Sequence, residues 1–288
     1  MNKKPLVCML AALVCSVPFA ACATPAAENE NDLPVAEETL PPVQEPIEPT
    51  APALPEEPEV PEVNEPDIPV VAEPEPGAGD YVKILSGGLN IRSGAGTNYA
   101  SLGTVEKDIL MKYAKKSGDW YETYYRGKVA YVSANPKYTA VAVLDTTSEK
   151  IEHVIEEGLR YVGTPYVYGA VRYHDGKGNK LKGFTKEKFD CSSYMQYIFL
   201  KGADVLLNTT TRTQISQGKE IKKADIQRGD LLFFTNASRK NNTGIERVGH
   251  VALYLGDNYI LHTASDYAKV EQITSLRWSY FITAKRVV

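Results

Sequence analysis

The chain has 288 residues, with 32 Lys and Arg against 36 Asp and Glu and a formal net charge of −4. The charge is uneven, because residues 23–79 hold 15 of the acidic residues and no base, whereas residues 80–288 carry a net charge of +9. This distribution excludes a single folded domain over the whole length, since so acidic a segment has too little apolar surface to build a core.

Residues 1–22 are typical of an export signal. Lys3 and Lys4 precede an apolar run from Leu6 to Ala20, which is too short for a permanent membrane helix. Two processing sites are compatible with the next residues: a lipobox-like FAAC that ends at Cys22, and an ordinary small-x-small site, ACA. The polar segment directly after Cys22 favours lipidation, which predicts an exported lipoprotein anchored to the membrane at the cell envelope.

Residues 23–79 hold 14 of the 18 prolines. Proline stiffness and like-charge repulsion predict a disordered, extended tether without a partner of its own. At about 3.1 Å per residue, its 57 residues reach at most ~180 Å. Such a tether would let a membrane-held protein act at a distance, within a cell wall.

The basic remainder of the chain suits an anionic polymer. A cell wall and a nucleic acid both fit that description. Export and the lack of a recognisable nucleic-acid module favour the wall, so we expect no nucleic-acid partner.

Residues 80–139 predict a small all-β barrel. The strand-like segments are VKIL, LNIR, YASLGTV, ILMKYAKK, WYETYY and KVAYVS, with turns at SGG, SGAGTN, KSGD and RGK. Gly94, Gly96 and Gly127 suit tight turns. LNIRSGAGTNYASLGTV and GDWYETYYRGKVAYVS resemble the bacterial SH3-like domain of wall hydrolases. The resemblance implies wall binding or shaping of the substrate cleft, with a structural spacer as the alternative.

A helix is expected after a linker at residues 140–147. Thr146 and Glu149 have the spacing of a capping box, and apolar residues from Ile151 to Val162 recur at helical intervals.

A second helix should begin at Cys191, with Asp190 as its N-cap, and end at Gly202. The later segments LLFFT, HVALYLG, NYILHTA and FITAKRVV have the composition of strands. Helices first and strands later predict an α+β domain over residues 148–288.

Cys191 is the only cysteine beyond residue 22. An unpaired thiol in an exported protein is exposed to oxidation unless it is buried or used. A small core residue is the plain interpretation. The first turn of a helix, however, favours the thiolate and lowers its pKa, which indicates a nucleophile.

A thiol nucleophile needs a base, and the chain has four histidines. His153 and His174 lie in polar surroundings, so we expect both to be solvated. His250 and His262 lie on consecutive predicted strands. If Leu255 pairs with Tyr259 across a three-residue loop, the two histidines are diagonal neighbours on one face. A two- or four-residue loop without a bulge would place them on opposite faces.

FDCSSYMQYIF, GDLLFF, VGHVALYLGD and the histidine twelve residues further on resemble the NlpC-type cell-wall cysteine peptidases over about residues 148–288. The resemblance implies a papain-like hydrolase that cuts the peptides of peptidoglycan. Carried over by position, Cys191 is the nucleophile, His250 the base and later the acid, and His262 the residue that orients His250.

Three substrate-binding residues follow from the same resemblance. Tyr166 aligns with a tyrosine beside the nucleophile, whose hydroxyl could bind the oxyanion; an aromatic lid on the core is the alternative. Asp190 and Ser192 align with positions that contact substrate, and Asp190 could bind a free amino terminus. The chain departs from the family pattern at Ser193 and Ala170, where glycine is common, and in two longer loops, residues 172–188 and 236–247.

The implied reaction is acyl transfer without a metal or cofactor. Several alternatives stay open: a zinc site at the two histidines, an amidase or acyltransferase with the same residues, and a wall-binding or scaffolding lipoprotein with an inactive hydrolase domain. The most specific expectation is cleavage between γ-D-Glu and the diamino acid of wall peptides with a free amino-terminal L-Ala. It assumes that the barrel closes one end of the cleft and that Asp190 pairs with the free ammonium.

Overall fold

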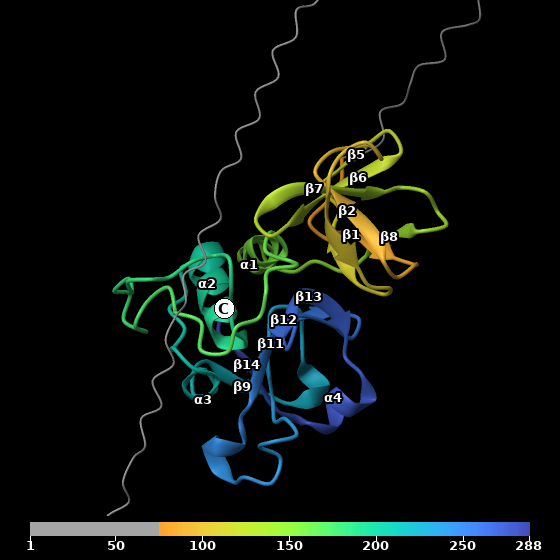
Figure 1. The fold of residues 1–288 in the computed structure, drawn as a ribbon. Helices are drawn as coiled ribbons and strands as arrows, with labels where there is room; N and C mark the ends of the chain where they lie inside the picture. Colours follow the sequence, from red (N-terminus) through yellow and green to blue (C-terminus); the bar gives the residue numbers. More distant parts are fainter. Residues whose placement is uncertain (1–74) are drawn as a thin grey trace, which may run out of the picture. The chain divides into compact units, whose positions relative to one another are not determined.

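The structure, a computed structural model, describes residues 75–288 (Figure 1). The predicted export signal, Cys22 and residues 23–74 of the predicted tether lie outside the described residues. Within residues 75–288, no helix is long and apolar enough to cross a bilayer. Eight strands come first and a mixture of helices and strands follows, which confirms the α+β class.

The strands predicted in the barrel segment are present, although ILMKYAKK forms two strands, β4 and β5, and not one. They are β1 (Asp80–Ile84), β2 (Leu89–Arg92), β3 (Ser101–Val105), β4 (Leu110–Lys112), β5 (Lys115–Ser117), β6 (Trp120–Tyr125) and β7 (Lys128–Ser133). Five of these strands form a sheet in the order β3-β2-β7-β6-β5. Alternate side chains of β6 are buried, as expected of a strand with one face on a core.

One detail of this segment corrects the prediction. Residues 139–143 belong to a strand, β8 (Thr139–Val143), and not to a linker, because they pair with β1 along its whole length. Gly94 and Gly96 lie in the β2–β3 connection without a positive φ, and the Tyr99 amide donates to the Gly96 carbonyl (3.3 Å) across a turn, as predicted. A Cβ at Gly94 would collide with the Tyr99 ring, so this glycine makes room for an aromatic side chain. Gly127, with φ of 77°, lies in the β6–β7 turn as predicted.

A nine-stranded sheet joins the barrel to the C-terminal part, in the order β8-β1-β4-β13-β12-β11-β10-β14-β9. Its C-terminal strands are β9 (Lys219–Ile221), β10 (Leu231–Phe234), β11 (His250–Gly256), β12 (Tyr259–Ala264), β13 (Tyr267–Gln272) and β14 (Phe281–Arg286). The sequence did not predict β13, because the charged residues in YAKVEQ conceal the alternation of a strand.

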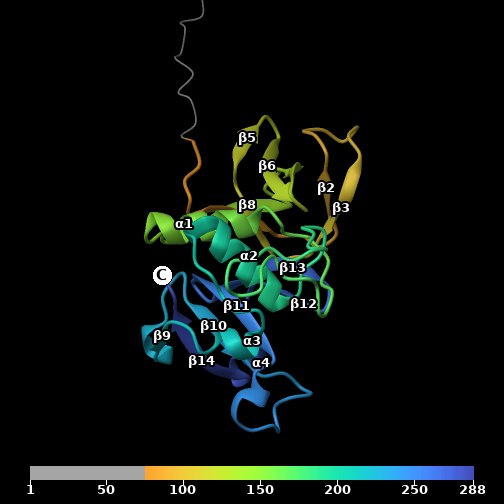
Figure 2. The same cartoon turned by 90° about the vertical axis from the view of Figure 1, so that its left-hand side faces the viewer.

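The helices are α1 (Glu149–Leu159), α2 (Cys191–Ala203), α3 (Thr211–Gln214) and α4 (Ser275–Ser279), with short 3₁₀ turns η1 (Lys223–Asp225) and η2 (Gly244–Arg247). α1 lies between the barrel strands and the C-terminal sheet in both views (Figures 1 and 2). Val251 and Leu253 pack in the core with α1 and α2, whereas Ala252 packs in a second cluster with Trp278 of α4. Each face of the sheet thus has its own core.

The start of α1 differs from the predicted capping box at Thr146. Its N-cap is Ser148, whose side chain makes no capping hydrogen bond. Glu152 performs a related task, because it accepts a hydrogen bond from the Thr147 amide (3.0 Å). The same carboxylate binds Arg228 through Nε (2.8 Å) and Nη2 (2.7 Å), and Arg228 Nη2 also donates to the Tyr81 hydroxyl (2.9 Å). This buried group connects the barrel to the C-terminal part.

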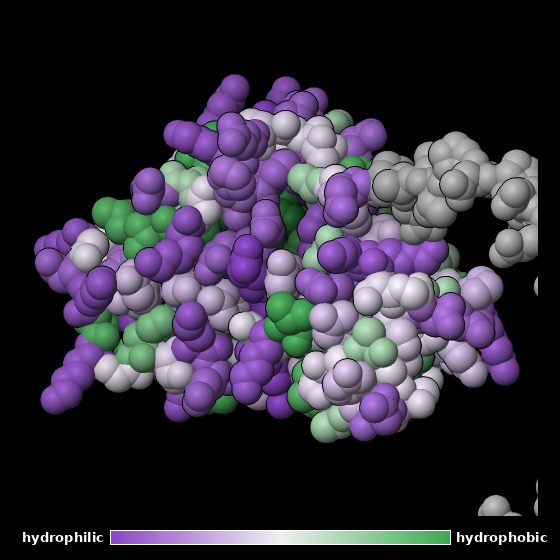
Figure 3. Space-filling model, turned by 90° about the horizontal axis from the view of Figure 1, so that it is seen from above, coloured by the Kyte–Doolittle hydropathy of each residue, from purple (hydrophilic) through white to green (hydrophobic). Residues whose placement is uncertain are grey.

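Further backbone contacts hold the barrel in place. The face shown in Figure 3 is mainly hydrophilic, with small separate apolar patches. Leu110 of β4 pairs with Val270 of β13. The Arg126 amide donates to the Val162 carbonyl (2.9 Å), and Arg126 Nε donates to the Gly163 carbonyl (2.8 Å). The barrel is therefore attached by hydrogen bonds, including the one from Arg228 to the Tyr81 hydroxyl, and by the ion pair of Lys269 with Glu106 (3.7 Å).

Candidate functional site

Cys191 is the first residue of α2, and Asp190 fixes its position. The Asp190 carboxylate accepts from the Ser193 amide (2.8 Å), and the Ser193 hydroxyl accepts from the Asp190 amide (2.9 Å), which is a capping box. The predicted helix start is confirmed, and the helix ends at Ala203, one residue later than predicted. Cys191 is 7% exposed and borders a pocket.

The environment of the Cys191 thiol contradicts the predicted lowering of its pKa. Burial and the neighbouring Asp190 carboxylate raise the pKa of the thiol to about 12, although the backbone N–H groups of Val251 and Ser192 act in the opposite direction. Burial therefore outweighs the helix N-terminus. The resting residue is a neutral thiol, so attack on a carbonyl requires a base.

The pairing of β11 with β12 confirms the predicted register. Leu253 lies opposite Leu261, and the same register places His250 and His262 on one face of the sheet as diagonal neighbours. Both histidines are buried, at 8% and 0% exposure. His250 and His262, twelve residues apart in the sequence, are thus in contact in the structure.

The loop between these strands differs from the three-residue loop that was predicted. Gly256 pairs with Tyr259 across a two-residue turn of Asp257 and Asn258, whose φ angles are 46° and 66°. A register shift between residues 254 and 256 compensates for the shorter turn. The bulge keeps both histidines on one face.

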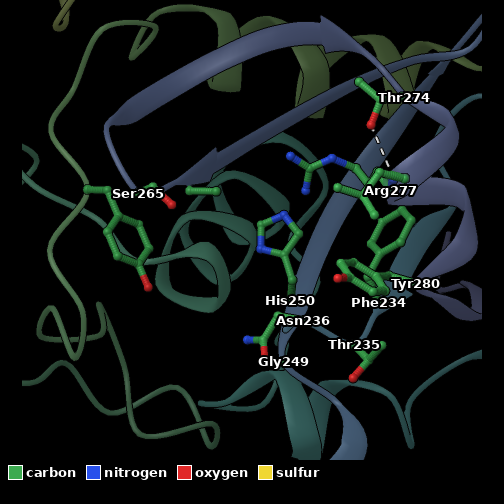
Figure 4. A pocket seen from close by; sticks show the side chains of 12 residues that line it. Phe234, Thr235, Asn236, Gly249, His250, Ser265, Thr274, Arg277 and Tyr280 are labelled. Carbon is green, nitrogen blue, oxygen red and sulfur yellow. Dashed lines mark hydrogen bonds between the residues drawn. The ribbon is translucent and has the colours of Figure 1, made fainter. Parts of the chain in front are cut away.

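The two imidazoles and an acidic residue form a continuous polar chain. His250 Nε2 lies 3.0 Å from His262 Nδ1, and His262 Nε2 lies 3.0 Å from Glu271 Oε1. The rings meet edge to face, with centroids 5.1 Å apart. Figure 4 shows His250 at the centre of its pocket, with Arg277 on one side and Phe234 and Tyr280 on another. We call Glu271, His262 and His250 the polar chain.

Glu271 was not foreseen from the sequence, because it lies on the unpredicted strand β13. Arg277 Nη2 lies 3.0 Å from its Oε1, and Lys269 Nζ lies 3.5 Å from its Oε2. Burial raises the pKa of Glu271, but the hydrogen bond with His262 and the charges of Lys269 and Arg277 outweigh it and lower this pKa to about 2. Glu271 is therefore ionised at any pH near neutrality.

The charge of Glu271 determines where the protons of the polar chain lie. An ionised carboxylate only accepts hydrogen bonds, so His262 carries its proton on Nε2 and presents an acceptor at Nδ1. His250 then donates from Nε2 to that acceptor. The remaining lone pair of His250 is at Nδ1, and this nitrogen is the one that can accept a proton from a thiol.

Both histidines are neutral in the resting site. Burial lowers the pKa of His250 well below its usual value, and the neighbouring His262 and Arg277 act in the same direction. Burial also lowers the pKa of His262, although Glu271 opposes the shift. A neutral imidazole with a free Nδ1 has the protonation state that a general base needs.

Tyr166 is attached to the segment that leads to Cys191. The Phe189 amide donates to the Pro165 carbonyl (3.1 Å), and the Val167 amide donates to the Phe189 carbonyl (2.8 Å). Burial, then the nearby Cys191 and Asp190, raise the pKa of Tyr166 to about 12, so its hydroxyl keeps its proton and can donate. Tyr166 lines the same pocket as Cys191, and its role beside the thiol stays a prediction.

Two pockets adjoin at the candidate site. The cysteine pocket is bordered by Cys191, and the histidine pocket by His250; Tyr166 and Gly249 line both. All residues that line these two pockets lie between 166 and 280. No barrel residue lines either pocket, and the expectation that the barrel closes one end of the cleft stays a prediction.

Asp190 and Ser192 line the cysteine pocket as predicted, but they already have a cationic partner. Arg172 Nη2 lies 2.8 Å from Asp190 Oδ2 and donates to the Ser192 hydroxyl (3.0 Å). The Ser192 hydroxyl in turn donates to Asp190 Oδ1 (3.0 Å). The first of the two long loops thus reaches the site through Arg172.

One histidine outside the site is misplaced in the prediction. His174 is fully buried, whereas His153 is exposed as expected. The His174 backbone exchanges two hydrogen bonds with the Gln196 amide group of α2 (3.3 and 3.1 Å), which holds the long loop against the helix.

Comparisons with known proteins divide the chain in the same way. Residues 163–287 match the NlpC/P60 family, and residues 87–135 match the bacterial SH3 domain. A gamma-DL-glutamyl hydrolase of Bacillus subtilis is 25% identical over 184 residues, which are 64% of this chain and 37% of the relative. A peptidoglycan DL-endopeptidase, CwlO, of Bacillus licheniformis is 28% identical over 49% of this chain and 28% of the relative. The matched stretch is thus about a third of these relatives' length.

Solved structures of the same family resemble parts of the chain. An NlpC/P60 family protein from Bacillus cereus is 19% identical, with a TM-score of 0.39, over 73% of this chain and 64% of that one. The peptidoglycan hydrolase RipB of Mycobacterium tuberculosis is 25% identical, with a TM-score of 0.38, over 48% of this chain and 65% of that one. At these scores the assignment depends on the two sequence families, and not on the structural superpositions.

Proposed function

We propose that this chain, which carries an NlpC/P60 domain behind a bacterial SH3 domain, is a cysteine endopeptidase that hydrolyses the peptides of peptidoglycan. The observation that carries the proposal is the polar chain, because it leaves one basic lone pair, on His250 Nδ1, in a pocket that adjoins the pocket of Cys191. A thiol, a neutral imidazole and a residue that orients the imidazole are the set that nucleophilic acyl transfer requires.

The reaction begins with a proton transfer. As the substrate carbonyl reaches the sulfur, the Cys191 thiol gives its proton to His250 Nδ1 and the sulfur bonds to the carbonyl carbon. The imidazolium that forms keeps its Nε2 proton on His262, and the charge of Glu271 stabilises it through His262. His250 then protonates the leaving amine, and the C–N bond breaks to give a thioester.

Water completes the cycle. The neutral His250 takes a proton from a water molecule, whose oxygen attacks the thioester carbonyl, and the proton passes to the sulfur as the acid leaves. The developing oxyanion meets the Tyr166 hydroxyl and the Cys191 amide, one of the first-turn donors that no helix carbonyl uses.

The positions of the two pockets orient the substrate. The leaving amine takes its proton from His250, so the residue that carries this amine belongs in the histidine pocket. The acyl part, which bonds to the sulfur, belongs in the cysteine pocket. We assign the diamino acid to the histidine pocket, where Arg277 offers a cation to its carboxylate.

The bond that we propose is the one between γ-D-Glu and the diamino acid. Two of the relatives have names that refer to DL-endopeptidase or gamma-DL-glutamyl hydrolase activity, which is compatible with this bond. The requirement for a free amino-terminal L-Ala is not part of this proposal, because Arg172 occupies Asp190 and the barrel lines neither pocket.

The proposed place of action is the cell wall, outside the cytoplasm, with residues 23–79 as a tether and a lipid anchor at Cys22. The basic charge of residues 80–288 suits an anionic wall polymer. The anchor can be tested by growing bacteria that express the chain with a radioactive fatty acid. The wild-type chain should carry the label, and the Cys22→Ala variant should not.

The activity is tested by mass spectrometry of purified peptidoglycan after incubation with the full chain. We expect new peptides that begin with the diamino acid, and none with Cys191→Ala. Release of glycan-free peptides cut at the lactyl amide would indicate an amidase instead. An unchanged wall with wild-type protein, together with binding to that wall, would favour the inactive scaffolding alternative.

A further inference from the structure

The cysteine pocket has an unusual charge pattern for a site that was expected to bind an ammonium group. Its lining includes three arginines from three separate segments: Arg172 of the loop 172–188, Arg212 of α3 and Arg239 of the loop 236–247. Asp190 is the only acidic residue among the residues that line it. Glu246, which lies 3.2 Å from both Arg212 and Arg239, leaves one positive charge in excess over this group.

The carboxylate of Asp190 has no capacity left for a substrate cation. Its Oδ1 accepts from the Ser193 amide (2.8 Å) and the Ser192 hydroxyl (3.0 Å). Its Oδ2 accepts from the Gly169 amide (3.2 Å) and from Arg172 Nη2 (2.8 Å). The side chain is 5% exposed. An incoming ammonium would therefore have to displace Arg172 from a buried ion pair.

Arg172 is itself held on all sides, so it does not leave easily. Its Nε donates to the Thr209 carbonyl (2.7 Å), its Nη1 to the Ala170 carbonyl (2.6 Å) and its Nη2 to the Ser192 hydroxyl (3.0 Å). The planar guanidinium can make these contacts simultaneously, which a lysine ammonium cannot reproduce. Arg172 is thus a fixed part of the pocket wall.

We infer that Arg172 replaces the substrate ammonium at Asp190, so that this chain takes stem peptides whose amino terminus is acylated, as it is in peptides still attached to glycan strands. The inference rests on the proposed function and names its substrate class. An acylated terminus is neutral and makes no demand on Asp190, whereas a free ammonium meets an occupied carboxylate and an excess of positive charge. The barrel lines neither pocket, so it does not restrict the amino-terminal side there.

The test compares two synthetic ligands, L-Ala-γ-D-Glu-diamino acid and its N-acetyl form. Their dissociation constants are measured by calorimetry with the full chain carrying Cys191→Ala, so that no turnover interferes. We expect the acetylated peptide to bind at least as tightly as the free one. Adding Arg172→Gln should leave the Asp190 carboxylate without its cationic partner. The ratio of the two dissociation constants, acetylated over free peptide, should then rise by about tenfold in favour of the free amine, which is typical of one charge-assisted hydrogen bond.

Two further variants separate the role of Arg172 from a general change of charge. Arg239→Gln removes a cation of the same pocket that makes no contact with Asp190, so it should shift the ratio much less than Arg172→Gln does. Arg172→Lys keeps the charge beside Asp190, so its ratio should stay close to that of the parent. Thermal unfolding of each variant verifies that the pocket is compared between folded chains.

The outcomes distinguish this inference from the proposed function. A tenfold preference of the Cys191→Ala parent for the free amine would overturn the inference and leave the proposed function intact. An unchanged ratio in folded Arg172→Gln would also overturn it. If neither peptide binds and the wild-type chain releases no wall peptides, the proposed function fails and the inference fails with it.

Discussion

The two sides of the candidate site are built in different ways. On one side, His250, His262 and Glu271 lie on three adjacent strands, and hydrogen bonds of 3.0 Å connect them in series. On the other side, Arg172 and Arg239 come from two long loops and meet Arg212 of the short helix α3. A sheet fixes side chains relative to one another through its register, whereas loops can change without disturbing that register.

This difference separates chemistry from selection. The strands hold the groups that move protons, so changes on the histidine side should lower kcat. The loops hold the groups that meet the acyl part of the substrate, so changes there should alter KM and the preference among substrates.

The first prediction concerns the two reacting residues. Cys191→Ala should abolish turnover, and His250→Ala should lower kcat by about 10²- to 10⁴-fold, the range that general base catalysis contributes. Both are measured as the rate of peptide release from purified wall. If Cys191→Ala retained turnover, Cys191 would not be the nucleophile.

The second prediction concerns the orientation of His250. His262→Gln keeps an acceptor for His250 Nε2 but loses the ring geometry, so kcat should fall by about 10²-fold, the cost of a misplacement of roughly 1 Å. His262→Ala should be the slower of the two, since it keeps no acceptor. If His262→Gln were inactive and His250→Gln active, the two roles would have to be exchanged.

The third prediction concerns Glu271, which acts through His262 and touches no substrate. Glu271→Gln leaves an acceptor but removes the charge, so we expect a fall in kcat of about tenfold at unchanged KM, in line with the loss of one charge-assisted hydrogen bond. Glu220→Gln is the matched control, because it removes an exposed carboxylate that pairs with Lys285 far along the sheet. Equal falls in kcat for both variants would show that the charge of Glu271 does not act specifically through His262.

The fourth prediction is a pH dependence. The pKa of His250 is lowered by burial, and the base must be neutral to accept a proton. Activity should therefore be present above that lowered pKa and be lost as the pH falls through it, which places the acid limb of kcat/KM below the usual histidine value of about 6.5. An acid limb at or above that value would mean that His250 is not the buried base described above.

Much of the histidine side could be predicted from the sequence, because the period of a strand converts spacing into geometry. The register of β11 and β12 was predicted correctly even though the turn was not, since the bulge near Gly256 compensated for the shorter loop. Glu271 was missed because YAKVEQ has no clear alternation; that strand is recognised only from its neighbours on both sides in the sheet.

The arginine side and the state of the thiol could not be predicted in the same way. Arg172 lies 18 residues before Asp190 in a loop without a period, and only the folded chain brings the two together. The pKa of Cys191 was predicted from its helix position alone, but burial decides its direction. Local pattern thus located the reacting groups, while their protonation and their partners depended on tertiary packing.

The central claim is that Glu271 fixes the protons of both imidazoles, so that His250 keeps a free lone pair at Nδ1. Nitrogen NMR of the full chain with ¹⁵N-labelled histidine tests it most directly, because the shifts of the two ring nitrogens report which one carries the proton. Near neutral pH we expect His250 and His262 both to be neutral and protonated at Nε2 only, with resonances assigned through His250→Ala and His262→Gln. A His250 that is protonated at Nδ1, alone or together with Nε2, would contradict the account.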